Sequence, residues 1–351
     1  MTLLSVMCLL DSRTTALRPA LFLAGALLAP SQSSGMTWRW SNPTPHGSPI
    51  YDMAWNGYLS VQVSERGQVY TGTDFLGWTP QNSGTTNDLE AVTFFGNRII
   101  ITGANGTVGY SDDGVNFTTT TLNTANWLVG VAASSNLVVA VGDNAVIYTS
   151  TDGANWHYQG QAPGNNGNWL LSVAWGAGVF VATGEGGYVA TSSNGTNWTR
   201  RPNPNGSPDL TRAAYIATTN APGTFPYTAF WAGTYDGQAF YSPDGSAWAR
   251  FTGTLSTNTF WAVTANNTSG LLAGNSDVCL STNASTWRKQ ADPLATQGSP
   301  APTWTYHAAL WDSTNCVYRL GGDDGMMVQG APTTFMPGKY SINPRTTCCG
   351  A

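Results

Sequence analysis

Hydrophobic residues along this chain come in short runs, each followed by a cluster of glycine, asparagine, serine or threonine. Between Trp127 and Gly160 the apolar runs LVGVAA, LVVAVG and VIYTS are followed by the turns SSN, DNA and TDGAN and then by WHYQ. The next stretch repeats this order as WLLSVAW, VFVAT, YVATS and WTRR. Short runs rich in β-branched and aromatic residues, bounded by turn-forming residues, predict antiparallel strands joined by tight turns. We expect four such strands in each repeating unit.

A motif of the form S-x-D-G-x-x-W recurs along the chain at nearly even spacing. Its copies are SDDGVNF (111–117), STDGANW (150–156), SSNGTNW (192–198), SPDGSAW (242–248) and STNASTW (281–287). Weaker relatives end at Trp78 and Phe335, so the closing aromatic residues are 39 to 50 positions apart. A period of about 40 residues indicates a repeat protein whose units pack into one body.

The recurring motif has a local physical explanation. We expect its Asp or Asn side chain to accept hydrogen bonds from turn amides, its glycine to adopt positive φ, and its aromatic ring to cover the hairpin. This explanation predicts a structural role, with catalysis as the alternative. The residues concerned are Asp113, Asp152, Asn194, Asp244 and Asn283, with the aromatic residues Phe117, Trp156, Trp198, Trp248 and Trp287.

These repeats resemble the Asp-box, or BNR, repeats of sialidase-like β-propellers. The resemblance is closest to the photosystem II stability/assembly factor-like propellers of exported bacterial proteins, and it covers about residues 37–340. It implies an all-β fold of four-stranded antiparallel blades, with each Asp-box turn between the third and fourth strands. It also implies that these turns lie on the face opposite the usual ligand-binding side. The motif specifies the fold and leaves the function open.

Seven repeating units can be placed, which predicts a seven-bladed β-propeller. Their first strands are expected to begin near Ile50, Leu89, Leu128, Leu170, Thr211, Phe260 and Thr305. The segment TWRWSNPTPHGSP (37–49) matches NWTRRPNPNGSP (197–208), which contains a fourth strand and its exit loop. We therefore expect residues 38–40 to form the outer strand of the last blade and to close the ring. In the alternative, residues 335–340 supply that strand.

The N-terminus resembles an export signal. Arg13 and Arg18 precede the apolar run 19–30, which is too short to span a membrane and is typical of a signal-peptide core. We expect residues 1–35 to be a leader, 36–342 the propeller and 343–351 a polar tail or a truncated boundary to another module. The protein is then exported to the periplasm, the cell surface or the medium.

Composition excludes several classes of protein. Charged residues make up only 9% of the chain, its net charge is −5, and no basic stripe is present to bind nucleic acid. No Cys/His spacing indicates zinc, and no glycine-rich phosphate loop is found, so no metal or cofactor is expected. Cys279 and Cys316 lie in adjacent repeats and can form a disulfide or remain buried thiols, while Cys348 and Cys349 lie in the tail. We expect a monomer without a transmembrane segment.

Two sets of residues are candidates for ligand chemistry. The turns between second and third strands carry Glu65, Asn105, Asp143, Glu185, Asp236, Asp277, Asp323 and Asp324. They either form a ring for a cation or sugar hydroxyls, or only satisfy tight-turn geometry. The inner strands carry Tyr51, Arg212, Trp261, Tyr306 and His307 as candidate pocket residues, with Asp52 and Glu90 as the only catalytic candidates. A lone histidine such as His307 is also compatible with a structural role.

The sequence favours binding over catalysis. The family's sialidases use an arginine triad, a tyrosine nucleophile and an N-terminal F/Y-R-I-P motif, whereas the nearest string here is NRII (97–100). Beyond the leader the only glutamates are Glu65, Glu90 and Glu185. We predict an exported, non-catalytic binding or scaffold propeller that recognises carbohydrate or another protein. The alternatives are a glycoside hydrolase with paired carboxylates and an assembly-factor-like chaperone of a membrane complex.

Overall fold

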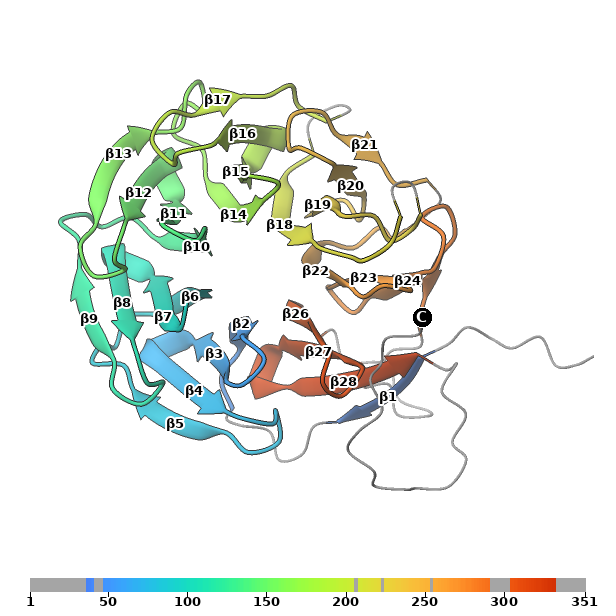
Figure 1. Ribbon diagram of the computed structural model, residues 1–351, viewed down its shortest axis with the longest axis horizontal. Helices are drawn as coiled ribbons and strands as arrows, with labels where there is room; N and C mark the ends of the chain where they lie inside the picture. Colours follow the sequence, from blue (N-terminus) through green and yellow to red (C-terminus); the bar gives the residue numbers. More distant parts are fainter. Residues whose placement is uncertain are drawn as a thin grey trace, which may run out of the picture. The chain divides into compact units, whose positions relative to one another are not determined.

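The described part of the chain forms a ring of seven antiparallel β-sheets (Figure 1). The computed structural model describes residues 36–40, 47–204, 208–221, 224–252, 255–290 and 304–332, which lie in one compact unit, residues 35–351. Within these ranges the chain forms 28 strands and five short 3₁₀ turns, with no α-helix. Each sheet has four strands. The predicted all-β, seven-bladed propeller is thereby confirmed.

The blades follow one another in chain order. The first comprises β2 (Ile50–Trp55), β3 (Ser60–Ser64), β4 (Gln68–Gly72) and β5 (Thr79–Asn82), and the second β6 (Leu89–Phe95), β7 (Arg98–Gly103), β8 (Thr107–Ser111) and β9 (Thr118–Thr121). The third comprises β10 (Leu128–Ala133), β11 (Val138–Gly142), β12 (Val146–Ser150) and β13 (His157–Gln161), and the fourth β14 (Leu170–Gly176), β15 (Val179–Gly184), β16 (Tyr188–Ser192) and β17 (Thr199–Arg200). The fifth comprises β18 (Leu210–Ile216), β19 (Ala229–Thr234), β20 (Ala239–Ser242) and β21 (Ala249–Arg250), and the sixth β22 (Phe260–Ala265), β23 (Gly270–Gly274), β24 (Val278–Ser281) and β25 (Trp287–Lys289).

The seventh blade combines the two ends of the described chain. It comprises β26 (Tyr306–Asp312), β27 (Val317–Gly322), β28 (Met327–Pro332) and the N-terminal β1 (Met36–Trp40), in the order β1-β28-β27-β26. Strand β1 runs antiparallel to β28, with Trp38 opposite Gly330 (Figure 1). The predicted closure by residues 38–40 is thus confirmed, and the alternative segment 335–340 lies outside the described residues. Closure removes the edge that β28 would otherwise expose.

The first strand of every blade lies innermost, around the central channel (Figure 1). Five of the predicted strand starts coincide with those observed, whereas Thr211 and Thr305 each miss the observed start, at Leu210 and Tyr306, by one residue. Thr305 instead forms an isolated bridge with Asn275. The one-residue difference at the start of β26 changes which of its side chains faces the channel.

The core lies between neighbouring blades. The second and third strands are covered on both faces, and all five residues of β11, β12 and β16 are buried. Strands buried on both faces read as continuous apolar runs, which explains the uninterrupted VVAVG and VIYTS segments. The fourth strands lie at the outside of the ring, so β9 is simply TTTT and mostly exposed. Buried apolar inner strands and a threonine-rich outer strand such as β9 agree with the small share of charged residues in the chain.

The recurring motif forms the turn between the third and fourth strands. We call segments 111–117, 150–156, 192–198, 242–248 and 281–287 the box turns. In the turn after β8, Asp113 Oδ1 accepts the Val115 and Asn116 amides, both at 2.8 Å. These bonds, with the amide side chain of Asn116, hold the pKa of Asp113 well below its ordinary value. Gly114 has φ of +74°, where a side chain is strained.

The box turns also fasten each blade to the one before it. A Cβ added at Gly153 would lie 2.4 Å from Ile100 Cδ1 of the second blade, and one at Gly195 would lie 2.5 Å from Leu137 Cδ2 of the third. The glycine therefore serves both the turn conformation and the contact between blades. The turn at 281–287 departs from this pattern, since Ala284 takes the glycine position with φ of +63°.

The two cysteines within the described residues differ in their bonding. Cys279 is a free, buried thiol, whereas Cys316 is disulfide-bonded, so these two residues do not form a disulfide with each other. Cys348 and Cys349 lie outside the described residues. Among the described residues, no helix has the length and apolar character needed to cross a membrane.

Candidate functional site

A β-bulge at the same place in every blade creates the candidate site. In each first strand the register with the second strand shifts between the first and third residues, from Ile50/Asp52 in β2 to Tyr306/Ala308 in β26. A bulge leaves one residue outside the ladder and re-aims its side chain. The seven bulged residues are Tyr51, Glu90, Val129, Leu171, Thr211, Trp261 and His307, and all of them line one pocket.

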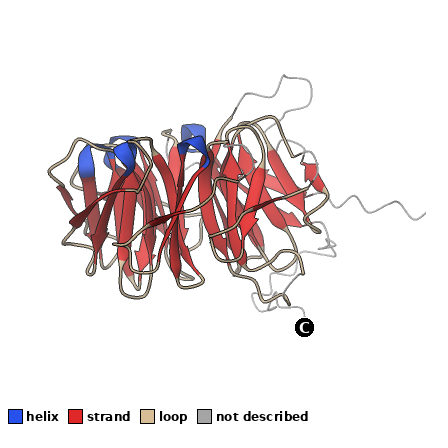
Figure 2. Ribbon diagram, turned by 90° about the horizontal axis from the view of Figure 1, so that it is seen from above, coloured by secondary structure: helices blue, strands red, loops and turns tan. Residues whose placement is uncertain are grey.

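This pocket, the mouth pocket, has a volume of about 450 Å³. Its remaining lining residues are Trp127, Trp169, Glu185, Arg212 and Tyr235. Glu185 begins the 3₁₀ turn η4 (Glu185–Gly187), and the related turns are η1 (Glu65–Gly67), η2 (Ala104–Gly106), η3 (Asp143–Ala145) and η5 (Asp323–Gly325). Figure 2 shows the helical turns gathered along one edge of the ring. The box turns join the opposite ends of the strands, so the mouth pocket lies on the face away from them.

Aromatic rings make up much of the mouth pocket. Tyr235 and Trp261 meet edge to face with ring centroids 5.0 Å apart, and Trp261 Nε1 donates to Asn275 Oδ1 at 2.9 Å. Trp127 and Trp169 form a second pair, at 6.5 Å. The rings of Trp127 and Tyr235 are among the most exposed large apolar groups described. Such a surface gives a ligand wide apolar contact with few rotamers to fix.

A third aromatic contact joins the first and seventh blades. Tyr51 and His307 meet edge to face at 5.8 Å, and His307 Nε2 lies 2.8 Å from Asp323 Oδ1. Burial, helped by the charges of Glu90 and Asp88, raises the pKa of Tyr51 to about 12. Tyr51 is therefore a neutral hydrogen-bonding phenol at physiological pH.

Glu90 is the unusual charged group of the mouth pocket. Burial first, and then the charges of Asp88 and Asp52, together raise the pKa of Glu90 to about 7. Among the described residues, no ion pair or hydrogen bond engages its carboxyl group. A carboxyl group in this state is poised to exchange a proton or to meet a ligand.

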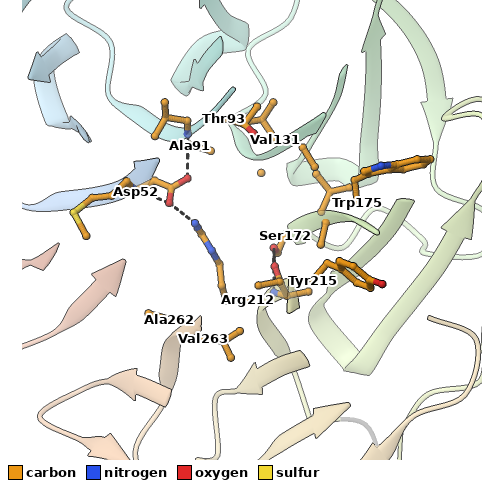
Figure 3. Close-up of a pocket in the computed structure, with 18 of the residues that line it drawn as sticks. Asp52, Ala91, Thr93, Val131, Ser172, Trp175, Arg212, Tyr215, Ala262 and Val263 are labelled. Atoms are coloured by element: carbon orange, nitrogen blue, oxygen red, sulfur yellow. Dashed lines mark hydrogen bonds and ion pairs between the residues drawn. The ribbon is translucent and has the colours of Figure 1, made fainter. Parts of the chain in front are cut away.

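Asp52 and Arg212 meet across the channel just inside the mouth pocket. They are 160 positions apart in sequence and form an ion pair between β2 and β18 (Figure 3). The Asp52 carboxylate also accepts the amides of Met53 at 2.9 Å and Val92 at 3.0 Å. Arg212 lines both the mouth pocket and a deeper cavity of about 260 Å³. Arg212 is thus shared by the two cavities, whereas Asp52 lines only the smaller one.

The other first strands carry small residues at the level of this ion pair. The equivalents of Asp52 and Arg212 are Ala91, Gly130, Ser172, Ala262 and Ala308. Figure 3 shows the Asp52 and Arg212 side chains directed toward each other, with Ala91, Ser172 and Ala262 around them. The Asp52 carboxylate is engaged by Arg212 and two amides and its residue is buried, which favours a structural role over catalysis.

The acidic turns do not converge on a shared ligand. Glu185 Oε2 accepts the Trp169 amide at 3.0 Å, and Asp143 Oδ1 accepts the Trp127 amide at 3.0 Å. Asp323 Oδ2 does the same for Thr305 at 2.9 Å. Glu65 bonds Ser48, Asn105 bonds Asn87, Asp236 bonds Thr234 and Gln238, Asp277 bonds Ser256 and Lys289, and Asp324 has φ of +54°. Geometry therefore assigns these residues to turn stabilisation.

The structure removes one residue from the predicted pocket and adds others to it. Tyr51, Glu90, Arg212, Trp261 and His307 are brought together as expected. Tyr306 is not among them: it is fully buried at the first position of β26, which Ile50 and Leu89 occupy in other blades. The predicted strand start at Thr305 was one residue early, so His307 takes the bulge and Tyr306 the core.

Sequence reasoning missed Trp127, Trp169 and Tyr235. Trp127 and Trp169 each directly precede a first strand, a recurrence that could have marked them, whereas Tyr235 lies in an irregular turn.

Comparison with known proteins gives structural matches only. No family model and no curated protein matches the chain. Among solved structures, YCF48 from Cyanidioschyzon merolae matches with TM-score 0.63 and 17% identity over 84% of this chain and 99% of the other. YCF48 bound to D1 peptide matches equally well, over 86% and 98% of the two chains. Virginiamycin B lyase from Staphylococcus aureus matches with TM-score 0.70 and 10% identity, over 84% and 99%. These likenesses show the fold alone.

Proposed function

We propose that this chain is a non-catalytic binding module that holds its ligand in the mouth pocket. The observation that carries the proposal is the bulge ring. Seven equivalent positions hold seven different residues, and these converge with three further aromatic side chains on one pocket of about 450 Å³. That volume lies within the range of ligand pockets, and polar groups set in an apolar lining are their usual composition.

A segment of another protein is the ligand class that we favour. Exposed tryptophan and tyrosine side chains are typical anchors of protein interfaces, and Trp127 and Tyr235 provide them here. The structure of YCF48 bound to D1 peptide offers a precedent for peptide binding by a propeller of similar fold. Carbohydrate is the second candidate, supported by the same open aromatic rings beside polar groups.

Two finer proposals concern family and location. We propose that the box turns are Asp-box repeats, because Asp113 and its equivalents bond the turn amides as that motif requires. An assembly-factor-like role then follows as an alternative, and pull-down of a membrane complex from cell envelopes would support it. Export is proposed from the apolar run 19–30, and sequencing the N-terminus of the mature protein tests it.

A glycoside hydrolase remains the catalytic alternative. Hydrolysis of this kind needs two carboxyl groups free to act on the glycosidic bond. Glu90 is free, but Glu185 is bonded to the Trp169 amide and Asp52 to Arg212. We therefore expect polysaccharide panels to show no release of sugar. Turnover that is lost in Glu90→Gln would replace the binding proposal with this one.

Peptide and glycan arrays probed with the full chain test the proposal. The double variant Trp127→Ala/Trp169→Ala should reduce array binding at least tenfold, because it removes one aromatic pair of the pocket. The matched control is Tyr58→Ala, which alters a tyrosine that is 75% exposed in the turn between β2 and β3, on the other face. Binding that survives the double variant and disappears with the control would place the ligand site on the wrong face.

A further inference from the structure

The charges of the mouth pocket do not balance within the chain. Four of its lining side chains can carry charge, namely Glu90, Glu185, Arg212 and His307. Arg212 is paired with Asp52, His307 contacts Asp323, and Glu185 accepts the Trp169 amide. Of these four, only the Glu90 carboxyl lacks a partner among the described residues, and the charges that act on it are the further carboxylates Asp88 and Asp52. A ligand that completes this site carries positive charge.

The aromatic walls favour the same sign of charge. Aromatic faces attract ammonium and guanidinium groups, most strongly where water is excluded. Within the described residues, the arginines that stack on rings do so elsewhere, with Arg98 on Tyr110, Arg200 on Tyr188 and Arg319 on Phe75. Among the described residues, no arginine or lysine therefore stacks on a ring of the mouth pocket.

From these observations we infer that the mouth pocket binds an organic cation, a lysine side chain of a partner protein, between the Glu90 carboxylate and the surrounding aromatic rings. This inference rests on the proposed binding function and adds the chemistry of the ligand. A flexible alkyl chain ending in an ammonium suits a pocket with apolar walls and one acidic group that has no partner in the described chain. The volume of about 450 Å³ accommodates such a side chain with part of its backbone.

Proton linkage gives the inference a distinctive signature. A bound cation stabilises ionised Glu90, so binding at pH 6 releases a proton and affinity rises as the pH passes through 7. The charges of Asp88 and Asp52 act on Glu90, and the pocket lining also holds Glu185, Arg212 paired with Asp52, and His307 in contact with Asp323. The pH profile of the native chain is therefore compared with that of a Glu90 variant, in which this proton is absent.

Calorimetric titration of the full chain with three capped tripeptides tests the inference. The central residue is lysine, Nε-acetyllysine or glutamate, so length and backbone stay constant while the charge changes. The lysine peptide should bind at least tenfold more tightly than the other two, since only it pairs with Glu90 and the rings. Its affinity should rise about tenfold from pH 5.5 to pH 8.5.

Two matched variants locate the effect. Glu90→Gln keeps the shape of the side chain, and it should weaken the lysine peptide about tenfold and flatten its pH profile. Glu65→Gln makes the same change on the same face, outside the pocket lining, and it should leave the affinity within twofold. Equal losses in both variants would show a general field effect and overturn the inference. Circular dichroism confirms that both variants are folded.

The remaining outcomes separate this inference from the proposed function. Equal binding of the lysine and acetyllysine peptides, or preference for the glutamate peptide, would refute the cation while leaving the mouth pocket a ligand site. Absence of any mouth-dependent binding, on the arrays and by calorimetry, would refute both. n-Butylamine binding as tightly as the lysine peptide would overturn the partner protein as source, because the peptide backbone would then add nothing.

Discussion

The two faces of the ring use the same repeat in opposite ways. On the box-turn face, equivalent positions in successive blades carry nearly the same residues, and their polar groups are bonded within the turn. On the mouth face, the bulged position carries a different residue in every blade, and Glu90 has no partner among the described residues. Repetition thus encodes the fold, and the departures from repetition gather at the proposed ligand site.

The carboxyl groups of the two faces differ in the same sense. Amides of the turn stabilise ionised Asp113 and Asp152, so their pKa values are lowered. Burial without a partner disfavours ionised Glu90, so its pKa is raised to about 7. A carboxyl group that the fold has satisfied holds the structure together, whereas one left unsatisfied is available to a ligand.

The largest expected effect tests an exception to this comparison. Asp52 lies at a varied position near the mouth, yet its oxygens are fully engaged by Arg212 and two amides. Asp52→Ala should therefore behave as a structural mutation and lower the free energy of unfolding by about 3 kcal/mol, because it strands a charge and two amides. Urea titration measures the change.

A double variant sharpens this first prediction. Asp52→Ala/Arg212→Met removes both charges together and should recover part of the lost stability, since no unpaired guanidinium remains in the channel. Strictly additive losses in the double variant would show that the two residues do not interact energetically.

The next effect separates conformation from packing in the box turns. Gly153 and Gly178 have nearly equal φ, +77° and +79°, but only Gly153 would place a Cβ against a neighbouring blade. Gly178→Ala should cost about 1 kcal/mol for the left-handed backbone, and Gly153→Ala about 2 to 3 kcal/mol because contact with Ile100 adds to it. Equal costs by urea titration would mean that the box glycines serve the turn alone.

The features of the fold that the sequence predicts are those set by residues close together in the chain. The turn residues around Gly153 act within a few positions, so period, strand order and blade number are readable without coordinates. The mouth depends on how whole blades are placed around the ring, which brings Asp52 of the first blade to Arg212 of the fifth. No local pattern in the sequence predicts a contact between residues so far apart. The β-bulge in each first strand also breaks the alternation of inward and outward side chains from which channel-facing residues are predicted. The strand start predicted at Thr305, one residue early, placed Tyr306 in the pocket instead of the core.

A smaller effect is expected from the unpaired acid of the mouth. The raised pKa of Glu90 means that its neutral form stabilises the fold below pH 4.5, and that this contribution is lost as the pH rises through about 7. Glu90→Gln stays neutral throughout, so it should exceed the native chain in stability by about 2 kcal/mol at pH 8.5 and match it near pH 4.5. Stability gained together with loss of the lysine peptide would identify a residue kept for binding. An equal difference at both pH values would contradict the assigned pKa.

The smallest effect is the mirror image of this one. Asp152 Oδ1 accepts the amides of Ala154 and Asn155, both at 2.8 Å. Because the pKa of Asp152 is lowered, its carboxylate stabilises the fold at pH values above the ordinary pKa of 3.8. This stabilisation is lost as the pH falls through the lowered pKa. Asp152→Ala should cost about 1 kcal/mol at pH 7, because the side chain is largely open to solvent. Asp152→Asn should cost less than half of that, since Asn194 accepts the equivalent amides at 3.1 and 2.9 Å in its own turn. Urea titrations at pH 7 and pH 3 measure both variants. If the asparagine variant loses as much as the alanine variant, the negative charge rather than the pair of accepted amides stabilises the box turns, and the turns at Asn194 and Asn283 would then be the weak points of the ring.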